Sequence, residues 1–325
     1  MTPVTADDCA APRLELDPSC GYRARGMRIR EHWPIARSRQ RRREFAAVFA
    51  TVPPRSLGDM LEVGSGDGFL ASLLAPLGTS LTTTEYAPGA ASHGCELPRL
   101  RCSVAELPFC DAAFDFIFSS SVLEHVRDRS GAMAELRRCL RPRGVMIHLM
   151  PSPTWKLLQL ALYYPHLAVS GIEYIGAERQ LPAATTAAET TTPAATTETT
   201  TETTTETTTE TTTEAWRDGG VKPSWWQELR RGVFPQVHGE YNGHVRELFG
   251  FRAKAWAAAF HRAGFEVRGC LRLPLYSGYG FGLERLRRAG ERVGLGAHNA
   301  FIVTHPGARP AAEAHWPCAA EGAAS

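Results

Sequence analysis

Residues 60–74 read MLEVGSGDGFLASLL: an apolar run, three glycines at alternate positions, and a second apolar run. The first run is typical of a buried strand, and the second is typical of a helix. Glycines between a strand and a helix let the backbone turn sharply and approach a ligand closely. The stretch therefore predicts a ligand-binding turn at the end of a strand.

The composition indicates one large globular domain with additions. The chain has 325 residues, of which 43% are apolar and 22% are charged. Its 36 basic and 34 acidic residues give a formal charge of +2, which argues against a protein built mainly to coat nucleic acid. The eight cysteines include no CxxC pair and no His/Cys cluster with zinc spacing, so we expect reduced thiols and no metal site.

No targeting or membrane segment is predicted. The N-terminus carries acids and prolines where a signal peptide needs a basic start and an apolar core. The longest apolar segment, 155–169, contains Lys156, Pro165 and His166 and is shorter than the roughly 20 residues of a membrane span. We expect a cytoplasmic protein.

Apolar strand candidates alternate with helical patterns from residue 60 onward. This alternation is typical of a doubly wound α/β fold, in which helices cover both faces of a mostly parallel sheet. Two late strand candidates would complete the sheet at one edge. The expected strands are 60–63, 80–86, 99–104, 114–120, 145–150, 265–275 and 297–306, and the expected helices are 68–77, 88–96, 133–140 and 251–264.

A basic segment precedes this core. Five arginines between residues 37 and 43 lead into Phe45, Val48 and Phe49, which have helical spacing. Residues 37–43 are either the solvated face of a helix packed on the main domain or a contact for an anionic partner, such as a membrane surface or a phosphorylated substrate.

A threonine- and glutamate-rich segment, 184–214, interrupts the chain. Its last five glutamates recur every fourth residue, so on a helix they would repel one another, and nothing apolar remains to bury. We expect a disordered acidic insert, with a spacer, a glycosylation target or a partner-binding tail left open as its role.

The glycine pattern does not fit the commonest phosphate-binding turns. The dinucleotide pattern G-x-G-x-x-G, counted from Gly64, requires a third glycine where this chain has Phe69. No G-K-[ST] follows, as a P-loop requires. Neither pyrophosphate nor triphosphate is the favoured ligand.

The sequence E-V-G-S-G-D-G resembles motif I of class I S-adenosylmethionine-dependent methyltransferases. The resemblance extends through Glu85 at the end of the second strand candidate, CSVAELPFCDAAFDFIFSSSVLEHV at 102–126, and LRRCLRPRGVMIHLMP at 136–151. It implies a seven-stranded, Rossmann-like sheet and S-adenosylmethionine as the cofactor. By this resemblance, the residues expected to bind the cofactor are Glu62, Gly64, Ser65, Gly66, Gly68, Glu85, Tyr86, Ser103, Val104 and Ser119.

The resemblance also assigns roles. Glu85 would accept hydrogen bonds from the ribose hydroxyls, and Glu62 would orient the methionine amino group; the plainer alternatives are an exposed acid and a strand-end contact. The chain departs from the family at Ser103, where an aspartate usually contacts the adenine amino group, and at Arg143, where the fifth-strand turn usually has glycine.

Methyl transfer needs alignment first and a proton acceptor second, for which histidine is the usual residue near neutral pH. His125 follows the fourth strand, where it either accepts a proton or orders the cofactor loop, whereas His148 is expected in the core or cleft. His238, Tyr241 and His244 belong to a polar stretch expected either to contact substrate or to form a surface loop. The candidate catalytic residues are His125, His238, His244 and Tyr241.

The expected function is methyl transfer to a small molecule, apolar or lipid-like. The apolar stretches 155–169 and 223–234 would either form a cap over the acceptor or merely pack on one another. One alternative is a non-catalytic relative. Another is a nucleic-acid methyltransferase, which SSSVLEHV disfavours because base-flipping enzymes carry an Asn/Asp-Pro-Pro-Tyr/Phe motif there. The expected regions are an N-terminal arm (1–35), the cofactor-binding core (36–151), a cap segment (152–183), the insert (184–214), the rest of the cap and sheet (215–308), and a flexible tail (309–325).

Overall fold

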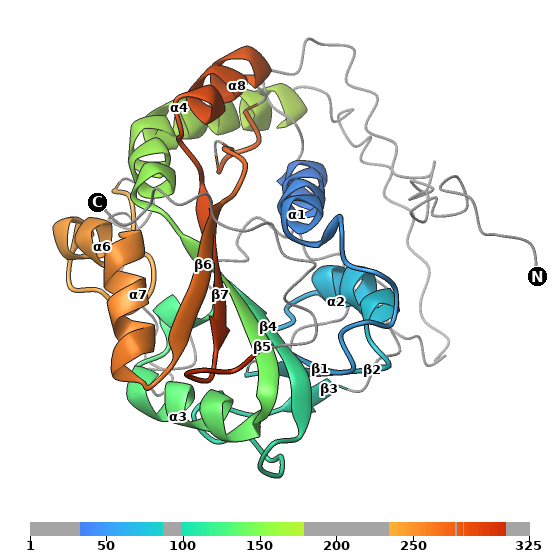
Figure 1. Ribbon diagram of the computed structural model, residues 1–325. Coiled ribbons are helices and arrows are strands. Elements are labelled where there is room, and N and C mark those ends of the chain that lie inside the picture. The colour runs from blue at the N-terminus through green and yellow to red at the C-terminus, as the bar shows by residue number, and fades with distance from the viewer. Residues whose placement is uncertain (1–32, 87–98, 179–233, 277, 282, 310–325) are drawn as a thin grey trace, which may run out of the picture.

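The computed structural model describes residues 33–86, 99–178, 234–276, 278–281 and 283–309 (Figure 1). The helix expected at 88–96 and the insert at 184–214 lie outside the described residues, as do nearly all of the N-terminal arm and the tail.

The expected doubly wound sheet is confirmed. Seven strands lie in the order β3-β2-β1-β4-β5-β7-β6, and all neighbours are parallel except for β7, which runs antiparallel to both β5 and β6. The last two strands thus complete one edge. The strands are β1 (Asp59–Val63), β2 (Ser80–Glu85), β3 (Arg99–Arg101), β4 (Phe114–Ser120), β5 (Leu140–Pro151), β6 (Glu266–Arg272) and β7 (His298–Thr304).

Helices cover both faces of the sheet (Figure 1). On one face, α1 and α2 pack on Met60, Phe116 and Phe118; on the other, α3 and α7 pack on Leu61 and Ile117. None of the described helices is long and apolar enough to cross a membrane. The helices are α1 (Trp33–Phe49), α2 (Phe69–Leu74), η2 (Ala75–Leu77), η3 (Leu123–His125), α3 (Arg129–Cys139), α4 (Pro153–Glu178), α6 (His244–Gly250), α7 (Ala253–Arg262) and α8 (Glu284–Arg292).

Several strand boundaries differ from the expectation: β3 and β6 each end three residues earlier than expected, and the start of β5 differs most. The sequence predicts a break between the helix at 133–140 and the strand at 145–150, where Pro142 and Gly144 stand, but both residues lie within strand β5, which already begins at Leu140. The pairing of β4 with β5 jumps from Phe114–Leu140 to Phe116–Val145, so the residues between form an irregularity of the strand. An irregular strand segment can hold a proline and a glycine that a regular ladder disfavours.

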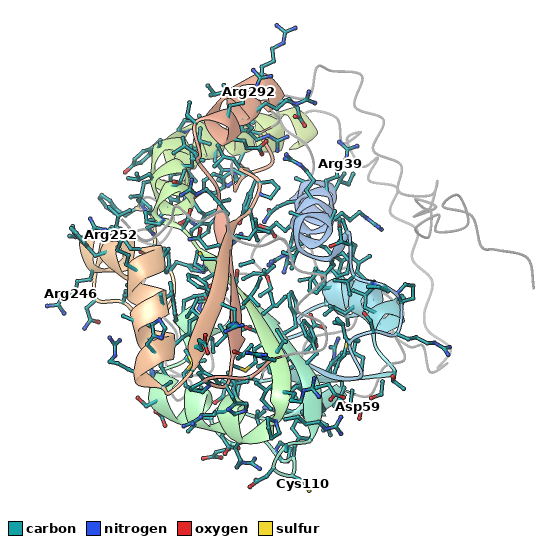
Figure 2. The ribbon with its side chains drawn as sticks, viewed as in Figure 1. Arg39, Asp59, Cys110, Arg246, Arg252 and Arg292 are labelled. Atoms are coloured by element: carbon teal, nitrogen blue, oxygen red, sulfur yellow. The ribbon has the colours of Figure 1, made fainter. Side chains whose placement is uncertain are left out.

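The basic helix α1 packs on the domain, and several of its arginines contact the molecule itself. Arg41 donates to the Ser120 hydroxyl, the Arg42 guanidinium lies 5.2 Å from the centre of the Phe69 ring, and Arg43 lies 2.9 Å from the Glu291 carboxylate. Arg39 is exposed and points outward (Figure 2). The helix therefore joins α8 to α2, the helix that follows the three glycines.

Truncating the central strand should test how much the core contributes. Phe116 on β4 is 1% exposed, so Phe116→Ala is expected to lower the free energy of unfolding by about 3–5 kcal/mol through lost burial and a residual cavity. Leu286→Ala on α8 is the control, because Leu286 is 68% exposed and its loss should change stability by no more than about 0.5 kcal/mol. Urea unfolding measures both, and equal effects would contradict the assignment of the core.

Candidate functional site

The glycine turn lies at the carboxyl ends of β1 and β2. Gly64, Gly66 and Gly68 have φ angles of 69°, 54° and 80°, in the left-handed region that glycine favours. The amide of Gly64 donates to the Thr84 carbonyl at 2.9 Å, and the amide of Gly66 donates to the Glu85 carboxylate at 2.7 Å. The turn is thus fixed to the end of β2.

The alternate glycines serve different purposes. A Cβ on Gly64 would lie 2.5 Å from Cγ2 of Val122, so the packing there excludes any side chain. A Cβ on Gly66 would have no described atom within 4 Å. Gly66 therefore faces a space that a ligand could fill.

Glu62, at the end of β1, is a buried acid beside this turn. It is 2% exposed, and its Oε2 accepts no hydrogen bond from the described residues. Burial raises the pKa of Glu62 to about 8, against an opposing influence from Arg41. A protonated carboxyl with an unused oxygen is suited to a cationic ligand group.

The remaining expected cofactor residues differ in their exposure and in their hydrogen bonds. Glu85 accepts from the amides of Gly66 and Tyr86, and Tyr86 itself is 74% exposed. The Ser103 hydroxyl accepts from the amide of Ala105 at 3.2 Å, so it is already used within its own loop. The other two side chains are buried: that of Val104 packs in the core, and Ser65 has a hydroxyl without a hydrogen-bond partner among the described residues.

Ser119 is buried and hydrogen-bonded to His148, with 2.7 Å between Oγ and Nδ1. Burial lowers the pKa of His148 to about 3, and its ring stacks on Phe260 at 5.3 Å. His148 is therefore a neutral core histidine, as expected.

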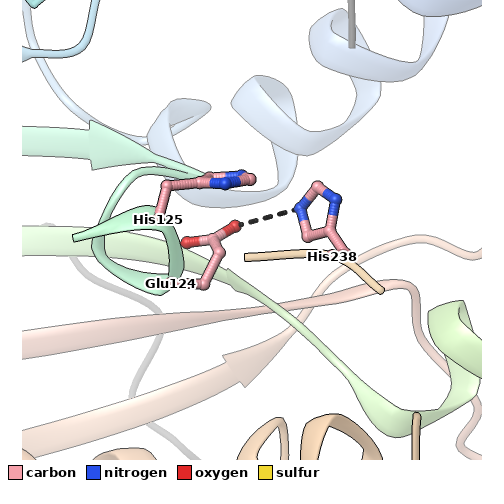
Figure 3. Close-up of side chains that lie close together, drawn as sticks. All are labelled: Glu124, His125 and His238. Carbon is pink, nitrogen blue, oxygen red and sulfur yellow. Dashed lines mark ion pairs between the residues drawn. The ribbon is translucent and has the colours of Figure 1, made fainter. Parts of the chain in front are cut away.

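Two of the four expected catalytic residues meet beside a buried acid (Figure 3). The rings of His125 and His238 are 4.5 Å apart, and Nε2 of His238 lies 3.7 Å from Oε1 of Glu124. Burial raises the pKa of Glu124, but His238 and His125 outweigh it, so the pKa of Glu124 lies below its usual range. Chain spacing could not reveal this cluster, because η3 and the loop of His238 are far apart in the sequence.

The other two expected catalytic residues lie apart, around α6. The ring of Tyr241 packs against Phe251 at 5.4 Å, and burial raises its pKa. His244, at the start of α6, lies 3.6 Å from the carboxylate of Glu247. Glu247 in turn forms a fully buried ion pair of 2.8 Å with Lys156, a residue of α4.

Sequence reasoning missed a second buried polar cluster at the same edge. Glu44 of α1 lies 2.5 Å from Nδ1 of His298, and both are nearly inaccessible to solvent. Burial raises the pKa of Glu44, but the charge and hydrogen bond of His298 outweigh it, so the pKa is lowered. The hydroxyls of Ser121 and Tyr276 each lie 3.4 Å from the His298 ring. The one available signal was the spacing of Glu44 and Val48: residues four apart lie on the same face of a helix, so Glu44 shares the face of an apolar residue.

The strand order and the turn at the carboxyl edge define the class of fold: a Rossmann-like methyltransferase fold. Residues 61–148 match the family model described as a methyltransferase domain. Residues 61–148 are therefore similar to methyltransferase domains, and a relative that matches this part of the chain is named as S-adenosylmethionine-dependent.

Individual relatives share this core. A protein of Mycobacterium tuberculosis named "probable S-adenosylmethionine-dependent methyltransferase" is 30% identical over 115 residues, 34% of this chain and 42% of that protein. The malonyl-[acyl-carrier protein] O-methyltransferase of Serratia marcescens is 33% identical over 27% of this chain and 36% of its own. A solved S-adenosylmethionine-dependent methyltransferase from Mesorhizobium loti is 11% identical, covering 83% of this chain and 96% of its own with a TM-score of 0.41. The chain thus spans less than half the length of these two sequence relatives.

Removing His298 should destabilise the fold, because Glu44 would then be a buried carboxylate without its partner. His298→Ala is expected to lower the free energy of unfolding by about 3–5 kcal/mol at pH 7, because it strands a buried carboxylate. The pKa of Glu44 is lowered in the folded state. Glu44 therefore stabilises the fold at pH values above its unfolded-state pKa, and this stabilisation is lost as the pH falls through the folded-state pKa. Urea unfolding at pH 7 and pH 4 should therefore show a smaller loss at pH 4; equal losses would contradict a charged pair.

Proposed function

We propose that this protein transfers a methyl group from S-adenosylmethionine to a small, apolar or lipid-like molecule. The single observation that carries the proposal is the turn at Gly66, which is held on the Glu85 carboxylate and faces open space. The buried, partly unpartnered Glu62 beside it supports a ligand that carries a positive charge.

In this proposal each cofactor-binding residue has a physical task. The Glu85 oxygens each retain acceptor capacity for a ribose hydroxyl, since a carboxylate oxygen can accept more than one hydrogen bond. Glu62 orients the methionine ammonium, and the backbones of Gly64, Ser65, Gly66 and Gly68 line the turn. Tyr86, Ser103, Val104 and Ser119 complete the surroundings of the adenosine and methionine parts. When bound, the cofactor supplies a methyl group on a sulfonium, which an aligned acceptor attacks in line.

The histidines at the Glu124 cluster are best placed to receive the acceptor's proton. His125 follows β4, at the edge where ligands bind in open α/β sheets, and His238 lies against both His125 and Trp155. Tyr241 and His244 lie on the neighbouring wall, where the raised pKa of Tyr241 makes its hydroxyl a poor base. We infer that Tyr241 and His244 line the acceptor site and help to determine its shape.

The apolar acceptor is supported by the surface of α4 and α6. Helix α4 begins directly after β5 ends at the carboxyl edge of the sheet. The buried Lys156–Glu247 ion pair joins α6 to α4. Such an apolar surface suits a hydrophobic acceptor. Its exposed members are Leu157, Tyr164 and Ile172 on α4 and Val245 and Phe249 on α6.

Labelled cofactor tests the proposal. We expect the full-length protein, given S-adenosylmethionine labelled in its methyl group and a total lipid extract, to move label into the organic phase. Gly66→Ala should weaken cofactor binding at least about tenfold, because the new Cβ fills the ligand's space.

The control is Gly307→Ala, since Gly307 also has a positive φ of 69° and no described atom near its Cβ, yet it lies after β7. Both variants therefore carry a similar backbone strain of about 1–2 kcal/mol. Equal cofactor affinities would overturn the assignment of the turn, and label transferred solely to water-soluble acceptors would overturn the apolar acceptor.

Cofactor binding should release a proton from Glu62. With its folded-state pKa at about 8, this carboxyl is mostly protonated at pH 7, and pairing with an ammonium group would ionise it. Without ligand, the stability it contributes is full below its ordinary pKa of 4.5 and is lost as the pH rises through about 8. The binding enthalpy of S-adenosylmethionine, measured by calorimetric titration in buffers of different ionisation enthalpy, should depend on the buffer for the wild type. For Glu62→Gln the binding enthalpy should be the same in every buffer. Buffer-independent enthalpies in the wild type would argue against this role.

A further inference from the structure

The cluster of Glu124, His125 and His238 has the composition of a metal site. One nitrogen of each imidazole and one carboxylate oxygen lie within 4.8 Å of one another. The side chains converge from η3 and from the loop that carries His238 (Figure 3). Two imidazoles and a carboxylate form a ligand set that binds Zn²⁺ and similar transition-metal ions.

The backbone holds the two segments together independently of these side chains. The amide of Glu240 donates to the Glu124 carbonyl at 2.9 Å. Gly239 has a φ of 72°, and a Cβ there would lie 2.5 Å from that same carbonyl oxygen. The loop can therefore approach η3 this closely because residue 239 is glycine, and the approach brings His238 to Glu124.

Among the described residues, the carboxylate of Glu124 has the two imidazoles as neighbours but no hydrogen-bond donor. It is fully buried, and among the described residues no hydrogen bond reaches either of its oxygens. The nearby Arg129 donates to the Glu124 carbonyl at 3.2 Å rather than to the carboxylate. A buried carboxylate without hydrogen bonds is costly unless a cation compensates it. The 3.7 Å separation from Nε2 of His238 is too long for a hydrogen bond.

We propose that Glu124, His125 and His238 bind a divalent transition-metal ion, with Zn²⁺ as the best match. Ligand atoms at the usual bond lengths around a tetrahedral zinc lie about 3.4 Å apart, close to the 3.7 Å between Glu124 and His238. Three protein ligands leave a fourth position open, as in catalytic zinc sites.

This site would change how the acceptor loses its proton, a consequence that rests on the proposed methyl transfer. Histidines bound to a metal no longer accept protons. An acceptor oxygen in the open position would instead lose its proton more readily, because a bound cation lowers the pKa of a coordinated oxygen. The binding of the metal itself requires no methyl transfer.

Cobalt provides a spectroscopic test on the full-length protein. After treatment with a chelator, we expect Co²⁺ to bind with a stoichiometry of one and to produce visible absorption bands, which Zn²⁺ then displaces. Glu124→Gln, His125→Gln and His238→Gln should each weaken Co²⁺ binding at least about tenfold, since even outer-shell changes cost that much. His261→Gln is the control, because this exposed histidine on α7 lies outside the cluster, and its Nδ1 is 3.2 Å from the Phe265 carbonyl.

Circular dichroism confirms that each variant is folded, and His238→Gln decides the test if Glu124→Gln fails to fold. Equal Co²⁺ affinity in the wild type and His238→Gln, or no Co²⁺ binding by the wild type, would overturn the metal site. Titration with S-adenosylmethionine is a separate measurement: cofactor binding without metal binding would leave the proposed function standing, and metal binding without cofactor binding would leave the metal site standing.

Discussion

The hydrogen bond from the Gly66 amide to the Glu85 carboxylate ties the end of the first strand to the end of the second. It forms only if the backbone between Gly64 and Gly68 follows the left-handed course that glycine permits. The same course begins α2, which packs Phe69 and Leu70 into the core. Turn geometry, helix packing and the opening beside Gly66 are consequences of one arrangement of the backbone.

Several polar side chains are buried at the carboxyl edge of the sheet, although polar groups are seldom buried in a protein interior. Glu62, Glu124 and Glu44 are all nearly inaccessible to solvent, yet they differ in their partners. Glu44 is paired with His298, whereas Glu62 and Glu124 keep carboxylate oxygens without hydrogen bonds among the described residues. Buried acids of the second kind indicate where ligands would compensate the cost of burial.

The fold could be read from the sequence because it depends on local patterns. Apolar runs and turn-forming glycines located the seven strands. The largest boundary error is the start of β5, because Pro142 and Gly144 signal a turn and equally fit an irregular strand, and the ends of β3 and β6 were placed three residues too late. The cofactor turn was recognisable for the same reason. The meeting of Glu124 with His238, and of Glu44 with His298, was not, since such contacts depend on how distant elements pack.

The direction of β7 has a consequence for how the molecule is assembled. Because this strand is antiparallel to β5, its first residue, His298, arrives at the edge where β5 ends at Pro151. Synthesis proceeds from the N-terminus, so the Gly66 turn emerges from the ribosome long before the strand that pairs with Glu44. A nascent chain can thus shape its cofactor turn early, while Glu44 must wait for the last strand of the sheet.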